Sequence, residues 1–164
     1  MVNLETLQEK LKAAFPGLEL LVVDNRGMME CLVPAEKNLE IATFLYKEMG
    51  FQFLTDLTAV HYPEKADKEL CVVFHLHNLV ENTRLRVKAD VPVAQPDIFS
   101  LVPLFAGANW MERETYDFFG VNFVGHPDLR RILNVDEMDY FPMRKEYQME
   151  DPTRLDKDDA MFGR

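Results

Sequence analysis

Two neighbouring segments in the middle of the chain alternate between apolar and polar side chains. They are LCVVFHLHNL (70–79) and NTRLRVKADV (82–91), and two residues separate them. Alternation with a period of two is typical of a β-strand that buries one face and exposes the other. Strands joined by so short a link pair as an antiparallel hairpin. The chain is therefore expected to build an antiparallel sheet with one covered face.

A turn centred on Val80-Glu81 would fix the register of this hairpin. The predicted neighbours are Leu76 with Leu85 and Phe74 with Val87 on the apolar face, and His77 with Arg84 and His75 with Arg86 on the polar face. The polar face is expected to be open to water or to a partner.

Helices and a second hairpin are expected before these strands. Helical spacing of apolar residues, capping residues and turn residues give their limits. The predicted elements are a helix over 4–15 with Asn3 as its cap, a hairpin of 18–24 and 28–34, and a helix that starts at Asn38 as its cap and ends at Gly50.

The segment FQFLTDLTAVHY (51–62) is apolar on both faces and rich in β-forming residues. This composition is typical of a central strand covered on both sides. Beyond residue 91, prolines interrupt the pattern, and short helical turns are expected from Asp97 to Phe105. Residues 1–104 are thus predicted to form an α+β domain, with a mixed, mostly antiparallel sheet and flanking helices.

Length and charge exclude several classes of protein. The chain has 164 residues, enough for one domain with a substantial core, and a formal net charge of −10. It lacks the basic face that binding to nucleic acid requires. No segment approaches the roughly 20 apolar residues of a membrane helix, and the first residues lack the pattern of a signal peptide. We therefore expect a cytosolic protein without a membrane span.

Cysteine and glycine usage argue against redox cofactors and nucleotides as ligands of this chain. Cys31 and Cys71 are its two cysteines, and both are expected to be buried thiols. A cysteine-bound iron–sulfur cluster needs four thiolates. None of the seven glycines lies in a phosphate-binding pattern, so NAD, FAD and ATP are not expected to bind.

A zinc site is one alternative on the polar face of the central hairpin. Cys71, His75 and His77 share that face, and thiolate and imidazole groups are zinc ligands. Three cations on the same face of the neighbouring strand disfavour a divalent metal there. At the end of the preceding strand, His61 is expected to be a hydrogen-bonded structural residue.

The run ERETYDFFGVNFVGHPDLRRIL (112–133) combines charged and aromatic residues. Its first part predicts a helix that Asn109 caps and Gly120 ends. Intrahelical ion pairs are expected to hold Arg113, Glu114 and Asp117 on the charged side. The inward side is expected to comprise Met111, Thr115, Phe118 and Phe119.

The second part of this run predicts a binding appendage. Residues 121–124 are expected to be extended, Gly125 permits a bend, and His126-Pro127 leads into a second helical piece over 128–133. From Pro142 onward the chain is charged and has little apolar periodicity. Residues 105–164 are thus expected to form a signature helix, a glycine-hinged turn and an extended tail that docks on partners.

An enzyme is the alternative from a different functional class. Glu112, Glu114, Asp117 and His126 are candidate general acids and bases, because a histidine beside carboxylates often carries protons. Carboxylates that pair with arginines on a regular helix stay charged, however, and are not poised near neutral pH. No serine or cysteine nucleophile lies among them, so catalysis by this chain alone is disfavoured.

Residues 112–121 (ERETYDFFGV) and 126–133 (HPDLRRIL) closely resemble the signature of the C subunit of respiratory NADH-quinone oxidoreductase, complex I, also called the 30 kDa subunit family. Residues 141–147 (FPMRKEY) are similar to its proline-leucine-arginine-lysine segment, and 56–60 (DLTAV) look like its central strand. His61, Phe141 and Met143 depart from the usual residues of the family. Relatives with the same signature also occur in membrane-bound hydrogenases and related dehydrogenases.

Membership of this family would imply a structural role. The family's subunit is described as a cofactor-free member of the peripheral arm on the cytoplasmic side, packed against the D subunit, and the B subunit is a second expected partner. The assembly oxidises NADH and passes electrons through FMN and iron–sulfur clusters to a quinone, coupled to proton translocation. On this reading, FMN, the clusters and the quinone belong to partner subunits.

The side chains expected at subunit interfaces lie in the carboxyl-terminal third and would be buried only on assembly. Alanine at Arg131 or Glu114 is accordingly expected to leave the melting temperature of the isolated domain nearly unchanged. The expected interface residues are Glu112, Arg113, Glu114, Asp117, Phe118, His126, Pro127, Arg130, Arg131, Arg144 and Lys145.

Two other functions remain open from the sequence. One is an equivalent scaffold role in a membrane-bound hydrogenase or related dehydrogenase complex. The other is a self-contained acid/base or zinc enzyme that uses His126, or His75 with His77.

Overall fold

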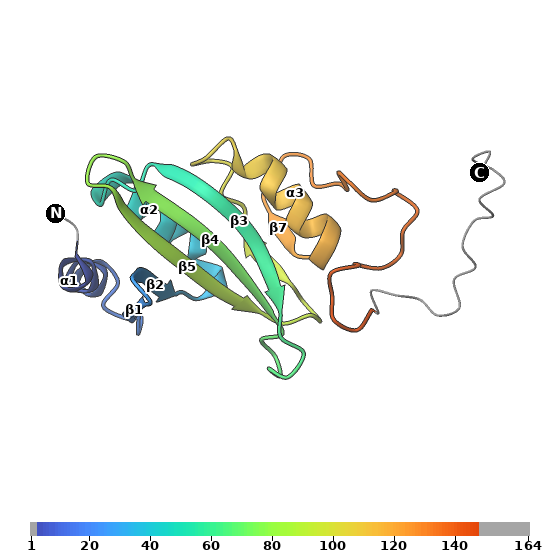
Figure 1. The fold of residues 1–164 in the computed structure, drawn as a ribbon, viewed down its shortest axis with the longest axis horizontal. Coiled ribbons are helices and arrows are strands. Elements are labelled where there is room, and N and C mark those ends of the chain that lie inside the picture. Colours follow the sequence, from blue (N-terminus) through green and yellow to red (C-terminus); the bar gives the residue numbers. More distant parts are fainter. Residues whose placement is uncertain (1–2, 148–164) are drawn as a thin grey trace.

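The computed structural model describes residues 3–147, with helices on one face and at one edge of a sheet (Figure 1). In chain order the elements are α1 (Leu4–Ala14), β1 (Val22–Asn25), β2 (Met28–Leu32), the 3-10 turn η1 (Ala35–Lys37), α2 (Asn38–Glu48), β3 (Phe53–His61), β4 (Leu70–Asn78), β5 (Thr83–Val91), β6 (Asp97–Phe99), α3 (Ala108–Phe119) and β7 (Asn122–Val124).

The five-stranded sheet has the order β1-β2-β5-β4-β3. Its β2–β5 pair is parallel and its other three pairs are antiparallel. The strands β6 and β7 form a separate parallel pair. The predicted α+β class with a mixed, mostly antiparallel sheet is confirmed.

The two predicted hairpins are both present. In the β4–β5 hairpin, all four predicted neighbour pairs are found, from Leu76 with Leu85 to His75 with Arg86. The β1–β2 hairpin turns at Arg26 and Gly27, which have φ angles of 57° and 84°. Positive φ at both central residues gives the turn a twist that matches the strands it joins.

One hydrophobic core fills the space between the sheet and the two helices α1 and α2. Figure 1 shows α2 behind the sheet and α1 beside β1. In β5, and in β4 from Phe74 onward, buried residues alternate with partly exposed ones as in a half-buried sheet, whereas residues 70–74 of β4 are buried on both faces. The fully buried side chains of these strands and helices include Leu7, Leu11, Ile41, Leu45, Val72, Phe74, Leu76, Leu85, Val87 and Ala89.

Three helix caps were predicted, at Asn3, Asn38 and Asn109, and only the first is confirmed; Asn109 lies inside α3, where Gly107 occupies the cap position. The side chain of Asn3 accepts a hydrogen bond from the Thr6 amide at 2.8 Å, which confirms it as the cap of α1. For α2 the prediction is wrong, because Lys37 occupies the cap position. The buried amide of Asn38 instead pairs with both backbone groups of Phe99, with its Nδ2 2.7 Å from the carbonyl oxygen and its Oδ1 3.2 Å from the nitrogen. Asn38 thereby joins α2 to β6.

The strand β3 lies at the edge of the sheet, so its predicted central position is wrong. Its side chains alternate, with Leu54, Leu57 and Ala59 buried and Phe53 48% exposed. The helix α3 packs along this strand (Figure 1), so a helix takes the place that a further strand would occupy. The apolar residues of β3 are therefore explained by the helix α3, which covers this edge strand. They do not require a central position in the sheet.

The segment 97–105 is only partly as predicted. A helical turn is present, in which Leu104 and Phe105 both donate to the carbonyl of Leu101. Residues 97–99 form β6 instead, because β7 supplies a strand with which they pair. The predicted extended piece at 121–124 is present as β7, and Gly125 bends the chain with a φ of 85°.

The core continues past residue 104, where the sequence suggested a boundary. Ile98, Leu101, Phe105, Phe119 and Phe123 belong to the same buried cluster as the side chains of the five-stranded sheet. The helix α3 and the strand β7 are therefore part of the folded body. We call residues 126–147 the arm; it follows this body and contains no helix or strand. The predicted helical piece over 128–133 is thus wrong.

Candidate functional site

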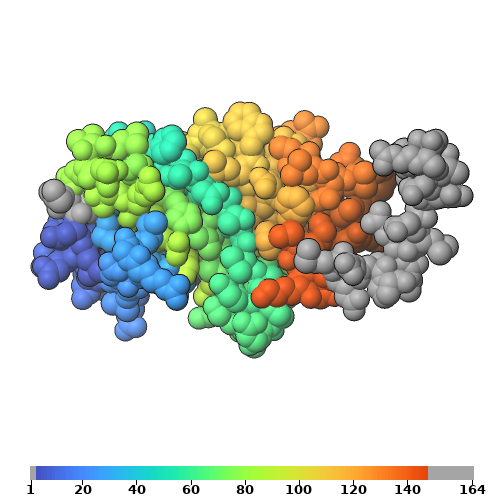
Figure 2. All heavy atoms as spheres, in the orientation of Figure 1, coloured from blue at the N-terminus to red at the C-terminus, as the bar shows by residue number. Residues whose placement is uncertain are grey.

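The helix α3 is the base on which the arm lies. It ends where predicted, at Gly120, whose φ of 75° is left-handed. Thr115 and Phe119 are buried, and Met111 and Phe118 pack partly against the core, as the predicted inward side requires. The arm runs beside this helix, and its orange and red atoms cover the adjoining surface in Figure 2.

Asp117 is the centre of the contact between α3 and the arm. Its side chain is fully buried. One carboxylate oxygen accepts from the backbone amides of Ile132, Leu133 and Asn134 at 3.1, 2.8 and 2.9 Å. The other accepts from Arg131 at 2.8 Å and from the side-chain amide of Asn134 at 3.1 Å. These three successive amides hold this part of the arm in a bend and prevent a helix.

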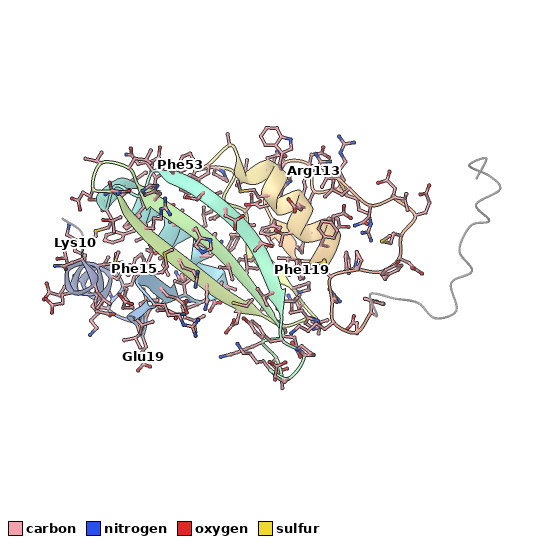
Figure 3. All side chains as sticks on the ribbon, in the orientation of Figure 1. Lys10, Phe15, Glu19, Phe53, Arg113 and Phe119 are labelled. Carbon is pink, nitrogen blue, oxygen red and sulfur yellow. The ribbon has the colours of Figure 1, made fainter. Side chains whose placement is uncertain are left out.

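The charge of Asp117 is well compensated. Burial alone would raise the pKa of this carboxyl, but the hydrogen bonds from Asn134, Leu133 and Arg131 outweigh burial and hold the pKa well below its usual range. The predicted ion network within the helix is wrong, because Asp117 pairs with Arg131 of the arm. Arg113 also turns to the arm, where it donates to the carbonyls of Arg130 and Arg131 at 3.2 and 3.0 Å (Figure 3).

The side chain of Arg131 links α3 to two other positions of the arm, Met138 and Tyr140. Its side chain is 9% exposed and forms an ion pair with Asp117. It also donates to the carbonyl oxygens of Met138 at 2.7 Å and Tyr140 at 3.0 Å. The premise that this side chain is buried only on assembly is wrong, and because alanine would leave a buried carboxylate without its cation, we expect it to destabilise the arm of the isolated chain. Glu114 is exposed, and the expectation that alanine there leaves the isolated chain nearly unchanged agrees with its position.

The far part of the arm is held at the end of α3. Arg144 donates through Nε to the carbonyl of Phe119 at 2.7 Å. The ring of Phe141 lies close to two guanidinium groups, 5.2 Å from that of Arg131 and 4.7 Å from that of Arg144. A Cβ at Gly120 would lie 2.5 Å from the Phe141 ring. Gly120 therefore serves both the left-handed turn and the close approach of the arm.

Glu112 is buried without a cationic partner. It is fully inaccessible, and it accepts from the Ser100 hydroxyl and the Leu101 amide, both at 2.6 Å. Burial raises the pKa of Glu112 to about 7, and these two hydrogen bonds lower it only in part. The expectation that arginines keep this acid charged is wrong. It caps the turn that starts at Leu101, so its contacts are structural.

Two histidines fix the chain at either end of the arm. The Nε2 of His126 lies 3.1 Å from the Asn109 carbonyl, and its Nδ1 accepts from the Asp128 amide at 3.0 Å. The buried His61 accepts through Nδ1 from the Lys145 amide at 3.0 Å. The prediction that His61 is a hydrogen-bonded structural residue is confirmed.

These contacts give the enzyme alternative no geometric support. Both ring nitrogens of His126 are occupied by the backbone, so it is not paired with Glu112 or Glu114. Glu112 and Asp117 are closed to solvent and hence to a substrate. A general acid or base must reach the proton that it transfers.

The zinc alternative also lacks the required geometry. His75 accepts from Arg86 at 2.9 Å, and His77 lies 3.2 Å from the side-chain oxygen of Asn82. Burial, followed by the charge of Arg86, lowers the pKa of His75. Within residues 3–147, no three His, Cys, Asp or Glu side chains are arranged to hold a metal ion. Cys31 and Cys71 are free and buried, as predicted.

The eleven expected interface residues fall into two groups. Six of them use their side chains to hold the arm or its base: Glu112, Arg113, Asp117, His126, Arg131 and Arg144. The other five are Glu114, Pro127, Arg130 and Lys145, which are exposed, and Phe118, which is partly buried. For all eleven residues, contacts with other subunits remain a prediction. Sequence reasoning missed Asn134 and Phe141, since neither has a local signal for its contact with α3.

Several large apolar side chains of the arm and of α3 remain exposed. Because the contacts with α3 use mainly backbone groups and buried charges, the apolar side chains face outward. They are Trp110, Leu133, Val135, Tyr140, Met143 and Tyr147, with exposed fractions of 60, 66, 63, 38, 55 and 39%. We call the five residues of the arm, together with the neighbouring Trp110 of α3, the arm's apolar residues. Such exposed apolar groups are typical of a surface that another protein covers.

Residues 31–153 match the family described as respiratory-chain NADH dehydrogenase, 30 Kd subunit. The chain belongs to this family. Its relatives include the C subunit of NADH-quinone oxidoreductase from Geobacter sulfurreducens, 41% identical over 145 residues that cover 88% of this chain and 90% of the relative. The same protein of Moorella thermoacetica is 39% identical, and the match covers 87% of this chain and 93% of the relative. The resemblance seen in the signature is therefore confirmed.

Two solved structures share the fold of this 30 kDa subunit. The trypsin-resistant fragment of Nqo5 is 33% identical with a TM-score of 0.66, and the match covers 77% of this chain and 98% of the fragment. A chain of the membrane-bound sulfane sulfur reductase, an archaeal respiratory membrane complex, is 28% identical with a TM-score of 0.74. That match covers 94% of this chain and 95% of the other. Within residues 3–147, no helix is long and apolar enough to cross a membrane.

Proposed function

We propose that this chain is a cofactor-free structural subunit in the peripheral arm of an NADH-quinone oxidoreductase. It docks on the cytoplasmic side against the D and B subunits of that complex. Membership of the 30 kDa subunit family supports this assignment. The observation that carries it is the arm, which is anchored from inside by Asp117 and Arg131 and presents its apolar residues to the outside.

An arm that is ordered before binding suits a docking surface. A flexible segment loses conformational freedom when it binds, and that loss opposes association. Here the hydrogen bonds from Ile132, Leu133 and Asn134 to Asp117 hold the arm in place in the free chain. Burial of the arm's apolar residues then contributes to affinity without a large ordering cost.

Electron transfer belongs, on this proposal, to other subunits. FMN, iron–sulfur clusters and the quinone are bound by partners, which carry electrons from NADH to the quinone and couple the transfer to proton translocation. The chemistry of the two thiols supports this view. Burial raises the pKa of Cys31 to about 11 and that of Cys71 to about 12, and a thiol that resists ionisation is a poor metal ligand.

A second host has a specific observation in its favour. The chain of the membrane-bound sulfane sulfur reductase matches almost the whole length of this chain at a TM-score of 0.74. The same body and arm are thus compatible with a scaffold role in a related membrane-bound respiratory complex, including the hydrogenase type. The partners distinguish the two hosts, because only an NADH-quinone oxidoreductase carries subunits that oxidise NADH.

Purification of the native complex through a tag on this chain tests the proposal. Mass spectrometry should find NADH-quinone oxidoreductase subunits, with the D and B subunits in amounts equal to the tagged chain. Leu133→Ser, at a side chain 66% exposed on the arm, should lower this recovery and leave the melting temperature of the isolated chain unchanged. The matched control is Leu79→Ser in the β4–β5 turn, where the side chain is 63% exposed. Recovery of a free chain without partners would refute the proposal.

A further inference from the structure

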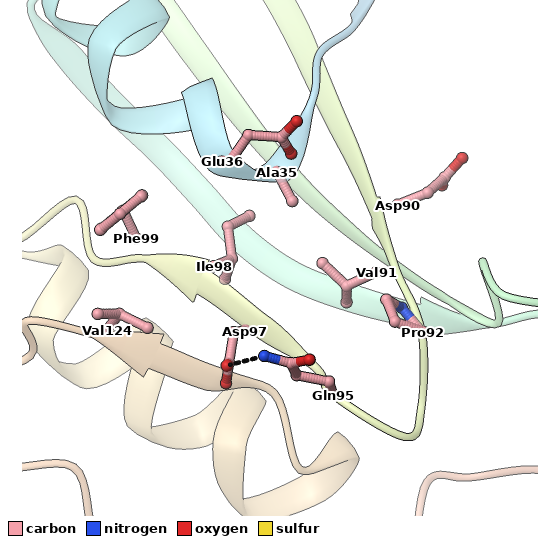
Figure 4. Close-up of a pocket in the computed structure, with 10 residues that line it drawn as sticks. All are labelled: Ala35, Glu36, Asp90, Val91, Pro92, Gln95, Asp97, Ile98, Phe99 and Val124. Carbon is pink, nitrogen blue, oxygen red and sulfur yellow. Dashed lines mark hydrogen bonds between the residues drawn. The ribbon is translucent and has the colours of Figure 1, made fainter.

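A groove of about 430 Å³ lies away from the arm, between η1, the end of β5 and β6 (Figure 4). Val91 and Ile98 are buried beneath it. Phe99 and Val124, which are 40% and 41% exposed, lie at one end. The groove thus offers apolar surface that the chain itself leaves uncovered, and none of the contacts of the arm uses it.

Three carboxylates surround this apolar surface: Glu36, Asp90 and Asp97. Asp97 accepts from the side-chain amides of Asn122 at 2.6 Å and Gln95 at 3.2 Å, which are neutral donors. Within residues 3–147, none of the three lies within ion-pair distance of a lysine, arginine or histidine. Asp90 also has a side-chain hydrogen bond with Cys71, again a neutral partner. In the described part of the chain, the three carboxylates thus have neutral partners or none, and together they favour a cation in the groove.

The groove continues into a second one, which lengthens it. This neighbouring groove of about 380 Å³ shares Ala35, Glu36 and Asp90 with the first. Glu19 adds a fourth carboxylate, and Lys68 and the half-exposed Leu32 also line it. A continuous trough with alternating apolar and acidic surface suits an extended polypeptide segment better than a small ligand.

The net charge of each candidate polypeptide indicates which one the acidic groove can bind. The segment 148–164 of this chain has five acidic and three basic residues, so its net charge is −2 and the groove repels it. A second copy of this chain, with a formal charge of −10, is also repelled. We propose that the groove binds an extended segment of a partner subunit, in which lysine or arginine side chains flank an apolar residue. This inference rests on the proposed function, because it requires that the chain works within a complex.

In this arrangement the basic side chains of the partner lie between Glu36, Asp90 and Asp97, and its apolar residue packs against Phe99 and Val124. The groove is a second docking surface, separate from the arm. Its contacts are charge-dependent, whereas those of the arm's apolar residues are not. High salt should therefore release the partner segment from the groove before it weakens the contacts of the arm.

Carboxylate labelling with a water-soluble carbodiimide and glycine ethyl ester, read by mass spectrometry, tests the inference. The native complex and the isolated chain are labelled side by side. In the complex, modification of Glu36, Asp90 and Asp97 should fall by about tenfold, since an interface excludes water and reagent. Omitting the amine should also yield direct cross-links from these carboxylates to lysines of one partner subunit. The exposed Glu64 in the β3–β4 loop is the control, and its labelling should not change.

Charge reversal supplies the second test. Glu36→Lys should lower incorporation into the complex and leave the melting temperature of the isolated chain unchanged, while Glu64→Lys should change neither. Equal labelling of the groove in the complex and the free chain overturns this inference but not the proposed function. Cross-links from the groove to residues 148–164 or to a second copy also overturn it. Absence of the chain from any complex overturns both.

Discussion

Replacement of Arg131 by alanine tests how the arm is held. The wild-type side chain makes four hydrogen bonds through its two terminal nitrogens, to the carboxylate and carbonyl of Asp117 and to the carbonyls of Met138 and Tyr140. Alanine removes all four. It also leaves Asp117, which is fully buried, with only amide donors around its charge.

The loss of stabilising free energy is expected to be large for a single substitution. Removal of one partner from a buried ion pair costs about 3–5 kcal/mol. Because Asp117 keeps the amides of residues 132–134 and the side chain of Asn134, the lower part of this range is expected here. The free energy is lost mainly from the closed state of the arm, since Arg131 contacts α3 and the arm and not the core of the five-stranded sheet.

The adjacent Arg130 is a matched control. Its ion pair with Asp128 has an N–O distance of 2.9 Å, but the two side chains are 67% and 58% exposed. Exposed pairs contribute roughly 0–1 kcal/mol. Arg130→Ala removes an identical side chain one residue away, so the difference in stability between the two variants measures the effect of burial.

Hydrogen exchange of the isolated chain, read by mass spectrometry on peptides that cover 131–140, measures opening of the arm. A loss of about 3 kcal/mol accelerates exchange by on the order of a hundredfold in Arg131→Ala, because each 1.4 kcal/mol is a factor of ten. Peptides from β4 and β5 should not change. If Arg131→Ala accelerates exchange no more than Arg130→Ala does, the arm is not held by the Asp117 contacts and the reasoning fails.

Three further perturbations address other contacts. The raised pKa of Glu112, about 7 against an ordinary 4.5, means that the folded chain holds this proton more tightly than the unfolded chain does. Stability should thus fall by on the order of 3 kcal/mol as the pH rises from 4.5 to 7, and urea titrations should show this slope reduced in Glu112→Gln. Gly120→Ala adds a left-handed strain of about 1 kcal/mol and a clash with Phe141, so trypsin should cut at Arg144 and Lys145 faster. In the control, Gly27→Ala, the added Cβ has no neighbour within 4 Å, and cleavage of the arm should not change. Asn38→Ala removes both partners of the Phe99 backbone and should lower the free energy of unfolding by about 2 kcal/mol in urea, without a change in arm proteolysis.

The sequence predicts the parts of this fold that depend on local pattern. The register of β4 with β5 follows from alternation and a short link, so Phe74 and Val87 were placed opposite each other correctly. Asn3 and Gly120 were identified from helix signals that act within one turn. The family signature in residues 112–133 predicted membership, although not the contacts that its residues make.

The errors come from partners that are distant in the chain. Asn38 has the chemistry of a helix cap, but Phe99, 61 residues away, uses its amide instead. Glu112 and Asp117 look like solvated helix acids, yet Ser100 and the amides around Leu133 bury them. No local pattern distinguishes a carboxylate that faces water from one that meets three amides of a later segment.

The central claim is that the arm is a docking surface for other subunits. Hydroxyl-radical labelling of the isolated chain and of the purified complex tests it most directly, with modification of Trp110, Leu133 and Met143 measured by mass spectrometry. Phe53 at the start of β3, which is 48% exposed and lies away from the arm (Figure 3), serves as the internal reference. We predict strong protection of the three residues in the complex relative to Phe53. Equal modification in both samples would show that the arm stays uncovered and would contradict the account.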